Sequence, residues 1–167
     1  MACPLCDELA RVEVGDSTWA IAKLSTGYVW LNPTQYYRGA TFFVSARCVA
    51  EIHDLDPGTR GRHLLEMAAV AAAVHRASGA RKMNYEALGN GVAHLHWWLT
   101  PRHQDDPRPR GPIWEDLDFL RLLWTDGAHP DPDEASCLRG LILGELRDED
   151  VTIERAYAEP RTSTDAG

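Results

Sequence analysis

The pattern of hydrophobic and polar positions predicts that the chain begins with short strands. Residues 18–24 and 28–32 are rich in aromatic and aliphatic side chains and are separated by a Ser-Thr-Gly turn, which predicts a β-hairpin. A third strand is expected over 40–45, after a turn-like stretch that contains proline and glycine. These segments are expected to pair in one antiparallel sheet.

A long helix is expected next, over 59–78. This segment is rich in Ala, Leu, Val and Met, follows an Asp-Pro-Gly start and stops at Gly79. Strands over 82–88 and 92–100 follow, joined by a tight Gly-Asn-Gly turn, and a second helix is expected over 132–147. This order predicts the α+β class, with an antiparallel sheet of about five strands, one long helix and a C-terminal helix.

The length of the chain favours a single domain. A core made from 167 residues buries enough apolar surface to fold unaided. Hydrophobic residues make up 44% and charged residues 25% of the chain, which is typical of folded globular proteins. We therefore expect one domain over 1–157. Residues 158–167 carry little apolar content and are expected to form a disordered tail.

Composition also narrows the compartment and the class of partner. The chain has no run of about 18 apolar residues, and its first residues lack the basic and apolar regions of a signal peptide. We therefore expect a cytoplasmic protein that does not bind membranes. The net charge of -8 argues against binding to duplex nucleic acid, which depends on Lys and Arg contacts to phosphates. A small anionic ligand needs only a local convergence of positive groups.

Residues 93–102, with the sequence AHLHWWLTPR, carry the clearest chemical signal. Side chains alternate along a strand, so His94, His96 and Trp98 are expected on one face. Two imidazoles would then be aimed at the same place, and a neutral imidazole nitrogen is a good nucleophile near pH 7. The alternative is that each histidine is an ordinary half-buried strand residue, but a pair at spacing two beside a Gly-Asn-Gly turn favours function.

This segment resembles the signature of the histidine triad superfamily, His-φ-His-φ-His-φ-φ, which many members continue with Pro-Arg. Other features stand in the family's order, from an N-terminal Cys-x-x-Cys through Asn32-Pro33 and the long helix to Asn84 and Gly89-Asn90. The resemblance runs from residue 3 to about residue 114. It implies a homodimer in which His96 attacks the α-phosphate of a nucleotide, a dinucleoside polyphosphate or a nucleoside phosphoramidate, giving a covalent nucleotidyl-histidine.

The resemblance also implies roles for residues around the nucleophile. Asn90 matches a residue that offers an amide donor to the phosphoryl oxygens, and Gly89 would let the backbone approach them. Asn32 matches the residue that holds the ribose, and Asn84 is expected to contact substrate as well. Structural alternatives stay open, because Gly-Asn-Gly is a good turn by itself and Asn32 can cap the turn that follows it.

Two positions depart from the family pattern. The third histidine of the signature is Trp98, and the histidine that often follows the strand-opening glycine is Ala40. Both histidines normally lie near the phosphates, so hydrolysis at family-typical rates is in question. The indole N–H of Trp98 is a weak substitute, and Arg102 is expected to meet either a phosphate or a carboxylate. Uridylyltransferases of the superfamily replace the third histidine and still transfer nucleotidyl groups.

The resemblance extends to a metal site. Cys3 and Cys6 form a Cys-x-x-Cys pair, which is typical of half a zinc site. Many superfamily members complete it with a histidine after the third strand and with the first histidine of the signature. The matching residues are Cys48 and His94, which implies a closed, structural Zn2+ site. His53 is a competing fourth ligand, and unligated thiols are the remaining alternative.

Two functions from different classes follow. The first is a nucleotide hydrolase or nucleotidyltransferase that works through nucleotidyl-His96, with hydrolysis favoured. The second is a zinc-stabilised nucleotide-binding module with little or no catalysis, because the third histidine is Trp98. His63 and His75, on the expected long helix, are expected to be exposed or at an interface.

Overall fold

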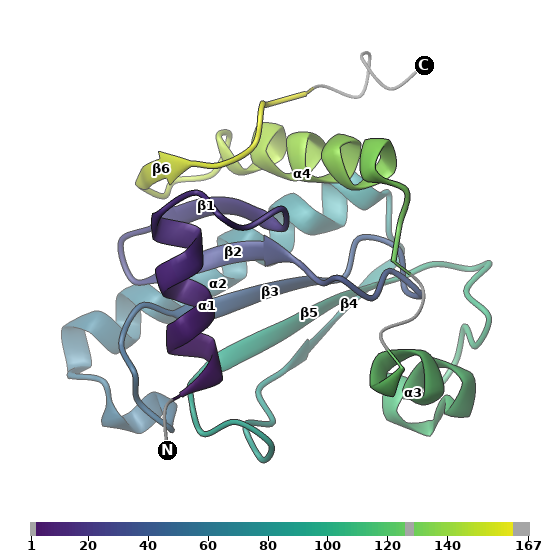
Figure 1. Ribbon diagram of the computed structural model, residues 1–167, viewed down its shortest axis with the longest axis horizontal. Helices are drawn as coiled ribbons and strands as arrows, with labels where there is room; N and C mark the ends of the chain where they lie inside the picture. The colour runs from purple at the N-terminus through teal and green to yellow at the C-terminus, as the bar shows by residue number, and fades with distance from the viewer. Residues whose placement is uncertain (1–2, 126–128, 162–167) are drawn as a thin grey trace.

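The computed structural model describes residues 3–125 and 129–161, whose strands form one six-stranded sheet (Figure 1). The strand order is β4-β5-β3-β2-β1-β6, and every neighbouring pair is antiparallel. The strands are β1 (Ala20–Leu24), β2 (Gly27–Leu31), β3 (Thr41–Ser45), β4 (Lys82–Glu86), β5 (His96–Arg102) and β6 (Ile153–Ala156). The α+β class is confirmed, and β6 adds an edge strand beyond the five expected.

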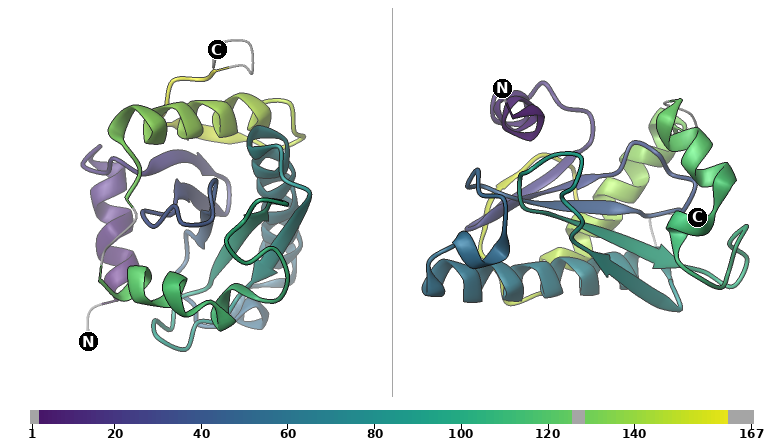
Figure 2. Two further views of the ribbon diagram at one scale, coloured as in Figure 1. Left: turned by 90° about the vertical axis from the view of Figure 1, so that its right-hand side faces the viewer. Right: turned by 90° about the horizontal axis from the view of Figure 1, so that it is seen from below.

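In the described part of the chain, four α-helices pack around the sheet, and two of them were not expected from the sequence. They are α1 (Pro4–Glu13), α2 (Pro57–Ser78), α3 (Leu117–Trp124) and α4 (Pro132–Leu146), with short 3-10 turns at η1 (Ile52–Asp54) and η2 (Ile113–Glu115). Figure 2 shows α1 on one side of the sheet and α2 on the other, and α4 packs beside α2. The molecule is therefore layered, and α1 and α3 are the additions to the predicted scheme.

The long helix α2 has clear signals at both ends. The side chain of Asp56 accepts a hydrogen bond from the Thr59 N–H at 3.0 Å, and Pro57 occupies the first turn, where its missing N–H costs nothing. At the other end Gly79 adopts the left-handed conformation, with φ +65°, which ends the helix. The helix confirms the expected segment and begins two residues before it.

The two faces of the sheet carry separate hydrophobic clusters. Under α2 and α4 the core contains Ile21, Val29, Phe43 and Leu99 from the strands, all fully buried. On the opposite face α1 covers a smaller cluster built on Tyr28, Trp30 and Val44, to which it contributes Leu9 and Val12. The short helix α1 is therefore the cover of one sheet face.

The strand that carries the histidine motif begins later than expected. β5 starts at His96 and continues through Pro101 to Arg102, whereas the sequence suggested a strand over 92–100. His94 therefore precedes the strand, and the expectation that it shares a strand face with His96 is wrong. The chain is instead held there by backbone bonds, because the Leu95 N–H donates to the Val49 carbonyl at 2.7 Å.

The C-terminal segment beyond β6 is described as far as residue 161. The Arg161 N–H donates to the Gly140 carbonyl at 2.9 Å, so this part of the expected tail lies along α4. Residues 162–167 lie outside the described part of the chain.

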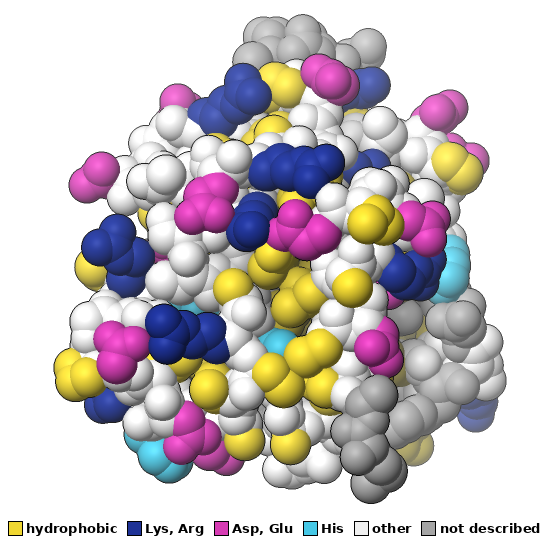
Figure 3. Space-filling view, turned by 60° about the vertical axis from the view of Figure 1, so that its left-hand side comes forward, with side chains coloured by type: hydrophobic (Ala, Val, Ile, Leu, Met, Phe, Trp, Pro, Cys, Tyr) yellow, Lys and Arg dark blue, Asp and Glu magenta, His cyan; other side chains and the backbone are white. Residues whose placement is uncertain are grey.

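On the surface shown in Figure 3, hydrophobic side chains gather in a central band, with acidic and basic side chains interspersed around it. None of the helices within 3–125 and 129–161 combines the length and apolar character needed to cross a bilayer.

Candidate active site and metal centre

Four side chains from three distant segments meet at one end of the sheet. Cys3 is the N-cap residue of α1, Cys6 lies in its first turn, Cys48 follows β3 and His94 precedes β5. Their ligand atoms all lie within 4.8 Å of one another. The Nδ1 atom of His94 is 3.3 Å from the Cys3 Sγ and 3.6 Å from the Cys6 Sγ. These distances suit four ligands around one ion, since tetrahedral ligands at about 2.3 Å lie about 3.8 Å apart.

A backbone hydrogen bond fixes which nitrogen of His94 faces the thiols. The Nε2 atom lies 2.8 Å from the Ser45 carbonyl oxygen, which can only accept, so Nε2 carries the proton. Nδ1 is then the lone-pair nitrogen and can bind a metal. Such a bond from the second ring nitrogen is the usual support of a histidine ligand. His94 is completely buried, so water does not compete for either nitrogen.

The ionisation of the thiols also fits a cation. Burial raises the pKa of Cys3, but the hydrogen bond from the Cys6 backbone and the close approach of the His94 ring outweigh it and bring the pKa down to about 6. Burial and the neighbouring sulfurs of Cys48 and Cys3 raise the pKa of Cys6 to about 12. Adjacent thiolates repel one another unless a positive ion lies between them. The donor set of three thiols and one imidazole therefore fits a metal ion.

The alternative ligand His53 lies outside this cluster. Its ring is exposed, and its Nε2 atom is 3.9 Å from the Asp54 carboxylate. Within the described residues, Cys48 therefore occupies the position for which His53 competed.

His96 uses its nitrogens in the opposite way. Its Nδ1 atom is 2.6 Å from the His94 carbonyl oxygen, so Nδ1 carries the proton and Nε2 keeps its lone pair. The half-buried ring lines a cavity of about 150 Å³. The other walls come from three segments of the chain, 50–52, 87–89 and 94–97. The imidazole therefore borders open space instead of being enclosed by apolar packing.

The Gly-Asn-Gly turn lies beside this cavity. Gly89 lines it and has φ +59°, a backbone conformation that favours glycine. Asn90 is exposed at the tip of the turn. The structure thus brings Gly89 and His96 to one cavity and leaves the Asn90 side chain in solvent.

Trp98, at the position of the third histidine, lies in a group of aromatic rings. Its ring centroid is 4.6 Å from that of Phe42 and 5.2 Å from that of Trp114, both at steep angles. Phe42 in turn lies 6.5 Å from the His96 ring. The motif face beyond His96 is therefore an aromatic surface, where relatives with a full signature place an imidazole.

Arg102 is buried, and its guanidinium forms hydrogen bonds with nearby residues of the following loop. Its guanidinium donates to the Asp106 carboxylate at 3.0 Å and to the carbonyls of Gly111 and Arg108 at 2.8 and 2.5 Å. Of the two partners weighed from the sequence, it therefore contacts a carboxylate. These bonds fix the loop that follows β5.

The two remaining asparagines lie away from the His96 cavity. Asn32 is buried at the end of β2, and its Oδ1 accepts a hydrogen bond from the Thr34 N–H at 2.9 Å, which is the turn-capping alternative. Asn84 is half-buried on β4 and lines a different cavity, of about 310 Å³, together with Arg81, Lys82 and Arg102. Their roles toward substrate stay predictions.

His63 is completely buried, so the expectation that it is exposed or interfacial is wrong. Its ring stacks on Phe43, its Nε2 accepts a hydrogen bond from the Trp97 indole at 3.1 Å, and its Nδ1 lies 3.1 Å from the Thr26 hydroxyl. That hydroxyl donates to the buried Glu66 carboxylate at 2.6 Å. Burial lowers the pKa of His63 to about 4, which keeps it neutral. An alanine-rich helix gives too weak a periodicity to reveal this buried face.

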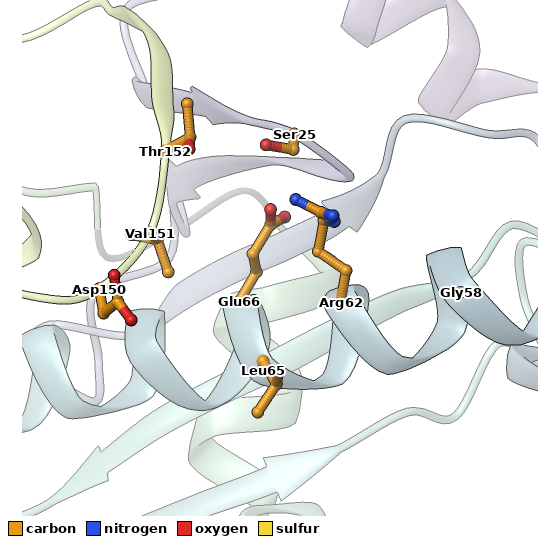
Figure 4. A pocket seen from close by; sticks show the side chains of 8 residues that line it. All are labelled: Ser25, Gly58, Arg62, Leu65, Glu66, Asp150, Val151 and Thr152. Carbon is orange, nitrogen blue, oxygen red and sulfur yellow. The ribbon is translucent and has the colours of Figure 1, made fainter.

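A larger cavity, of about 470 Å³, lies between α2, the β1–β2 turn and the segment 150–152. Figure 4 shows Arg62 and Glu66 rising from α2 toward Ser25, while Leu65 points the other way. This cavity mixes a cation with the carboxylates of Glu66 and Asp150 and holds no nucleophile from the motif. The smaller cavity at His96 is therefore the candidate active site.

Glu86 is a residue near the motif that the sequence did not single out. The Trp114 indole N–H donates to the Glu86 Oε2 at 2.7 Å, and Glu86 pairs with Trp98 across β4 and β5. Alternation from Asn84 along β4 was the available signal for Glu86.

Neither a protein-family model nor a curated protein matches the chain, but solved structures do. A histidine triad protein from Sinorhizobium meliloti is 27% identical over 77% of this chain and 91% of its own, with a TM-score of 0.58. One from Bradyrhizobium japonicum is 26% identical over 74% and 89%, with a TM-score of 0.62. A Zn-bound histidine triad family protein from Mycobacterium smegmatis is 19% identical over 88% of this chain and 94% of its own, with a TM-score of 0.58. This identity is low, so the match supports the fold alone.

Proposed function

The chain belongs to the histidine triad superfamily by fold and by motif, and from this premise we propose that it is a nucleotidyl-transferring enzyme. It breaks the bond between the α-phosphate of a nucleotide, dinucleoside polyphosphate or nucleoside phosphoramidate and its leaving group. His96 carries the nucleoside monophosphate (NMP) in between. Water is the favoured acceptor, which makes the protein a hydrolase.

The observation that carries this proposal is the 2.6 Å contact between the His96 Nδ1 and the His94 carbonyl. It holds the proton of the neutral ring on Nδ1, so Nε2 keeps the lone pair without the help of a separate base. The ring also borders a cavity into which a phosphate can enter. A preformed nucleophile at the wall of a cavity is what a covalent mechanism needs.

The neighbouring turn supports binding of the phosphoryl oxygens. Gly89 brings backbone to the cavity beside His96, and Asn90, the next residue in the chain, remains a proposed donor to the phosphoryl oxygens. The aromatic surface of Phe42 and Trp98 offers apolar contact to the rest of the ligand. Asn32 and Asn84 remain proposed contacts for the sugar and the departing part of the substrate, and Arg102 supports the loop beside them.

We propose Zn2+ as the ion held by Cys3, Cys6, Cys48 and His94. Three thiols and an imidazole are the ligands zinc prefers in closed structural sites, and a complete set of four leaves no position for substrate. The ion would fasten α1 and the segment before β5 to the end of the sheet. We further propose that the protein acts in the cytoplasm as a homodimer, without membrane or duplex nucleic acid as a partner.

The test is intact-mass analysis of the protein after mixing with a panel of adenylated and uridylylated compounds. We expect a mass increase of one NMP that is labile in acid, as phosphoramidates are, and release of free NMP in water alone. The matched control is His96→Gly, which should give neither. Unmodified wild-type protein and no NMP release across the panel contradict the proposal.

A second candidate is a nucleotide-binding module without turnover. The observation that favours it is the packing of Trp98 against Phe42 and Trp114, which replaces a polar group by ring contacts where the family has its third histidine. In that case nucleotide would bind to the wild-type protein by equilibrium titration, no adduct would form, and His96→Ala would leave NMP release at background.

A further inference from the structure

Glu86 lies next to the nucleophile on the same face of the sheet. It is paired with Trp98 across β4 and β5, and paired residues of antiparallel strands share a face. His96 is two residues before Trp98, so its side chain is on that face as well and stands diagonally to Glu86. Diagonal neighbours of this kind have Cα atoms about 7–8 Å apart, a gap that a substrate phosphate can bridge.

The surroundings of Glu86 favour a carboxyl group that keeps its proton. Burial raises its pKa above the usual range, against the hydrogen bond from Trp114 and the charge of Arg102, which lower it. Trp114 occupies Oε2, so the proton of the neutral acid resides on Oε1. The charged or titratable groups that face Glu86 are Arg102 and His96, both on β5, and η2 presents the uncharged Trp114.

We propose that Glu86 is the general acid for the leaving group and takes the place that Trp98 leaves without a proton donor. This inference rests on the proposed function. Trp98 cannot release a proton near neutral pH, whereas a half-buried carboxyl group beside it can. Two other carboxylates with little exposure, in the segments after β5, are engaged, because Asp106 pairs with Arg102 and Asp116 caps α3.

The proposed step balances without a further reactant. The Nε2 lone pair of His96 forms a bond to the α-phosphorus, and the bond from phosphorus to the leaving nitrogen or oxygen breaks with its electron pair on the leaving atom. Glu86 gives that atom its proton and becomes a carboxylate. Water then attacks phosphorus, Glu86 takes a proton from it, and the electron pair of the phosphorus–nitrogen bond returns to Nε2.

The test compares leaving groups in Glu86→Gln, which keeps an oxygen to accept from Trp114. Two probes are made from the same nucleoside monophosphate, and the pair is prepared once with AMP and once with UMP. The first probe is an alkylamine phosphoramidate, whose amine must be protonated to leave. The second is a p-nitrophenyl ester, whose p-nitrophenolate leaves as an anion. We expect kcat/KM to fall about 100-fold for the phosphoramidate and less than about threefold for the ester. The alkaline limb of the pH profile for the phosphoramidate should also disappear.

Two further variants keep the result interpretable. Glu115→Gln, an exposed carboxylate on η2 that pairs with Arg108, should leave both probes unchanged. Glu51, the N-cap residue of η1, borders the His96 cavity and is the rival acid. A leaving-group-dependent loss in Glu51→Gln in place of Glu86→Gln therefore overturns the assignment.

The outcomes separate this inference from the proposed function. Equal losses on both probes in Glu86→Gln, or no loss on either, overturn the role of Glu86 while wild-type turnover keeps the function. Absence of wild-type turnover on both probes, together with absence of an adduct on His96, removes the proposed function and the inference with it.

Discussion

His94 and His96 are two residues apart, yet their imidazoles are held in opposite ways. His94 is completely buried; its Nε2–H donates a hydrogen bond to the Ser45 carbonyl, and its Nδ1 faces the thiols. His96 is half-buried and lies beside a cavity; its Nδ1–H donates a hydrogen bond to the His94 carbonyl, so Nε2 is the nitrogen that stays available. In each case a carbonyl oxygen decides which nitrogen is available.

This difference shows that the chemistry open to a histidine depends on which of its ring nitrogens a backbone carbonyl binds. His94 lies before β5, where the chain is irregular, and His96 is the first residue of the strand. The two rings therefore do not repeat each other along one face. One suits metal binding and structural support, and the other suits nucleophilic attack.

The largest effect that breaks the comparison is expected from His94→Ala. Removing a ligand from the proposed zinc site should release the metal and lower the free energy of unfolding by about 3 kcal/mol. Metal content by mass spectrometry and chemical unfolding measure the two effects. His96→Ala is the matched control and should retain the metal and change stability by less than about 1 kcal/mol. Equal metal content in the two variants would contradict the assignment.

A third imidazole sharpens the comparison, because His63 is buried without thiols. Its folded pKa is about 4 and its ordinary value is 6.5, so the folded protein keeps it neutral while the unfolded chain gains a proton as pH falls. Its contribution to stability is therefore complete above pH 6.5 and is lost toward pH 4, by up to about 3 kcal/mol.

The measurement is the difference in unfolding free energy between wild type and His63→Gln at each pH, which cancels effects common to both proteins. We expect wild type to lose stability more steeply than the variant from pH 7 to pH 4. His75→Gln, an exposed position on the same helix, should follow wild type. Parallel curves for wild type and His63→Gln would show that His63 does not titrate in this range.

The smallest effect is expected at Cys48, the exposed member of the metal cluster. Cys48→His should retain the metal, because imidazole is also a good zinc ligand, and should change stability by less than about 1 kcal/mol. Cys48→Ser should retain less metal in competition with a chelator. Full retention by Cys48→Ser would exclude Cys48 from the ligand set.

Much of the fold was predictable because its signals are local. The hairpin of β1 and β2, the helix α2 with its proline start and glycine stop, and the C-terminal helix follow from patterns within about 20 residues. α1 and β6 were missed for a physical reason, since each is short and gains its stability from tertiary packing against the sheet. Leu9 and Val12 stabilise α1 only when they pack against Tyr28 and Trp30 of the sheet.

The candidate site was predictable in composition and less so in geometry. The Cys-x-x-Cys pair and the spacing of His94 and His96 indicated the residues, and the structure gathers all four expected ligands. Strand alternation failed at His94 because the ladder begins at His96. Glu86 escaped notice because its bond to Trp114 depends on how the loop after β5 folds back, which no local pattern encodes.

The position of Cys3 and Cys6 at the start of α1 links metal binding to the covering of one face of the sheet. Two of the four expected ligands lie at the N-cap and in the first turn of the helix that covers Tyr28, Trp30 and Val44. Without the proposed zinc ion, α1 would lose this attachment to the end of the sheet, and the aromatic side chains beneath it would become accessible to other chains. Zinc binding would then protect the protein from aggregation as well as stabilise its fold.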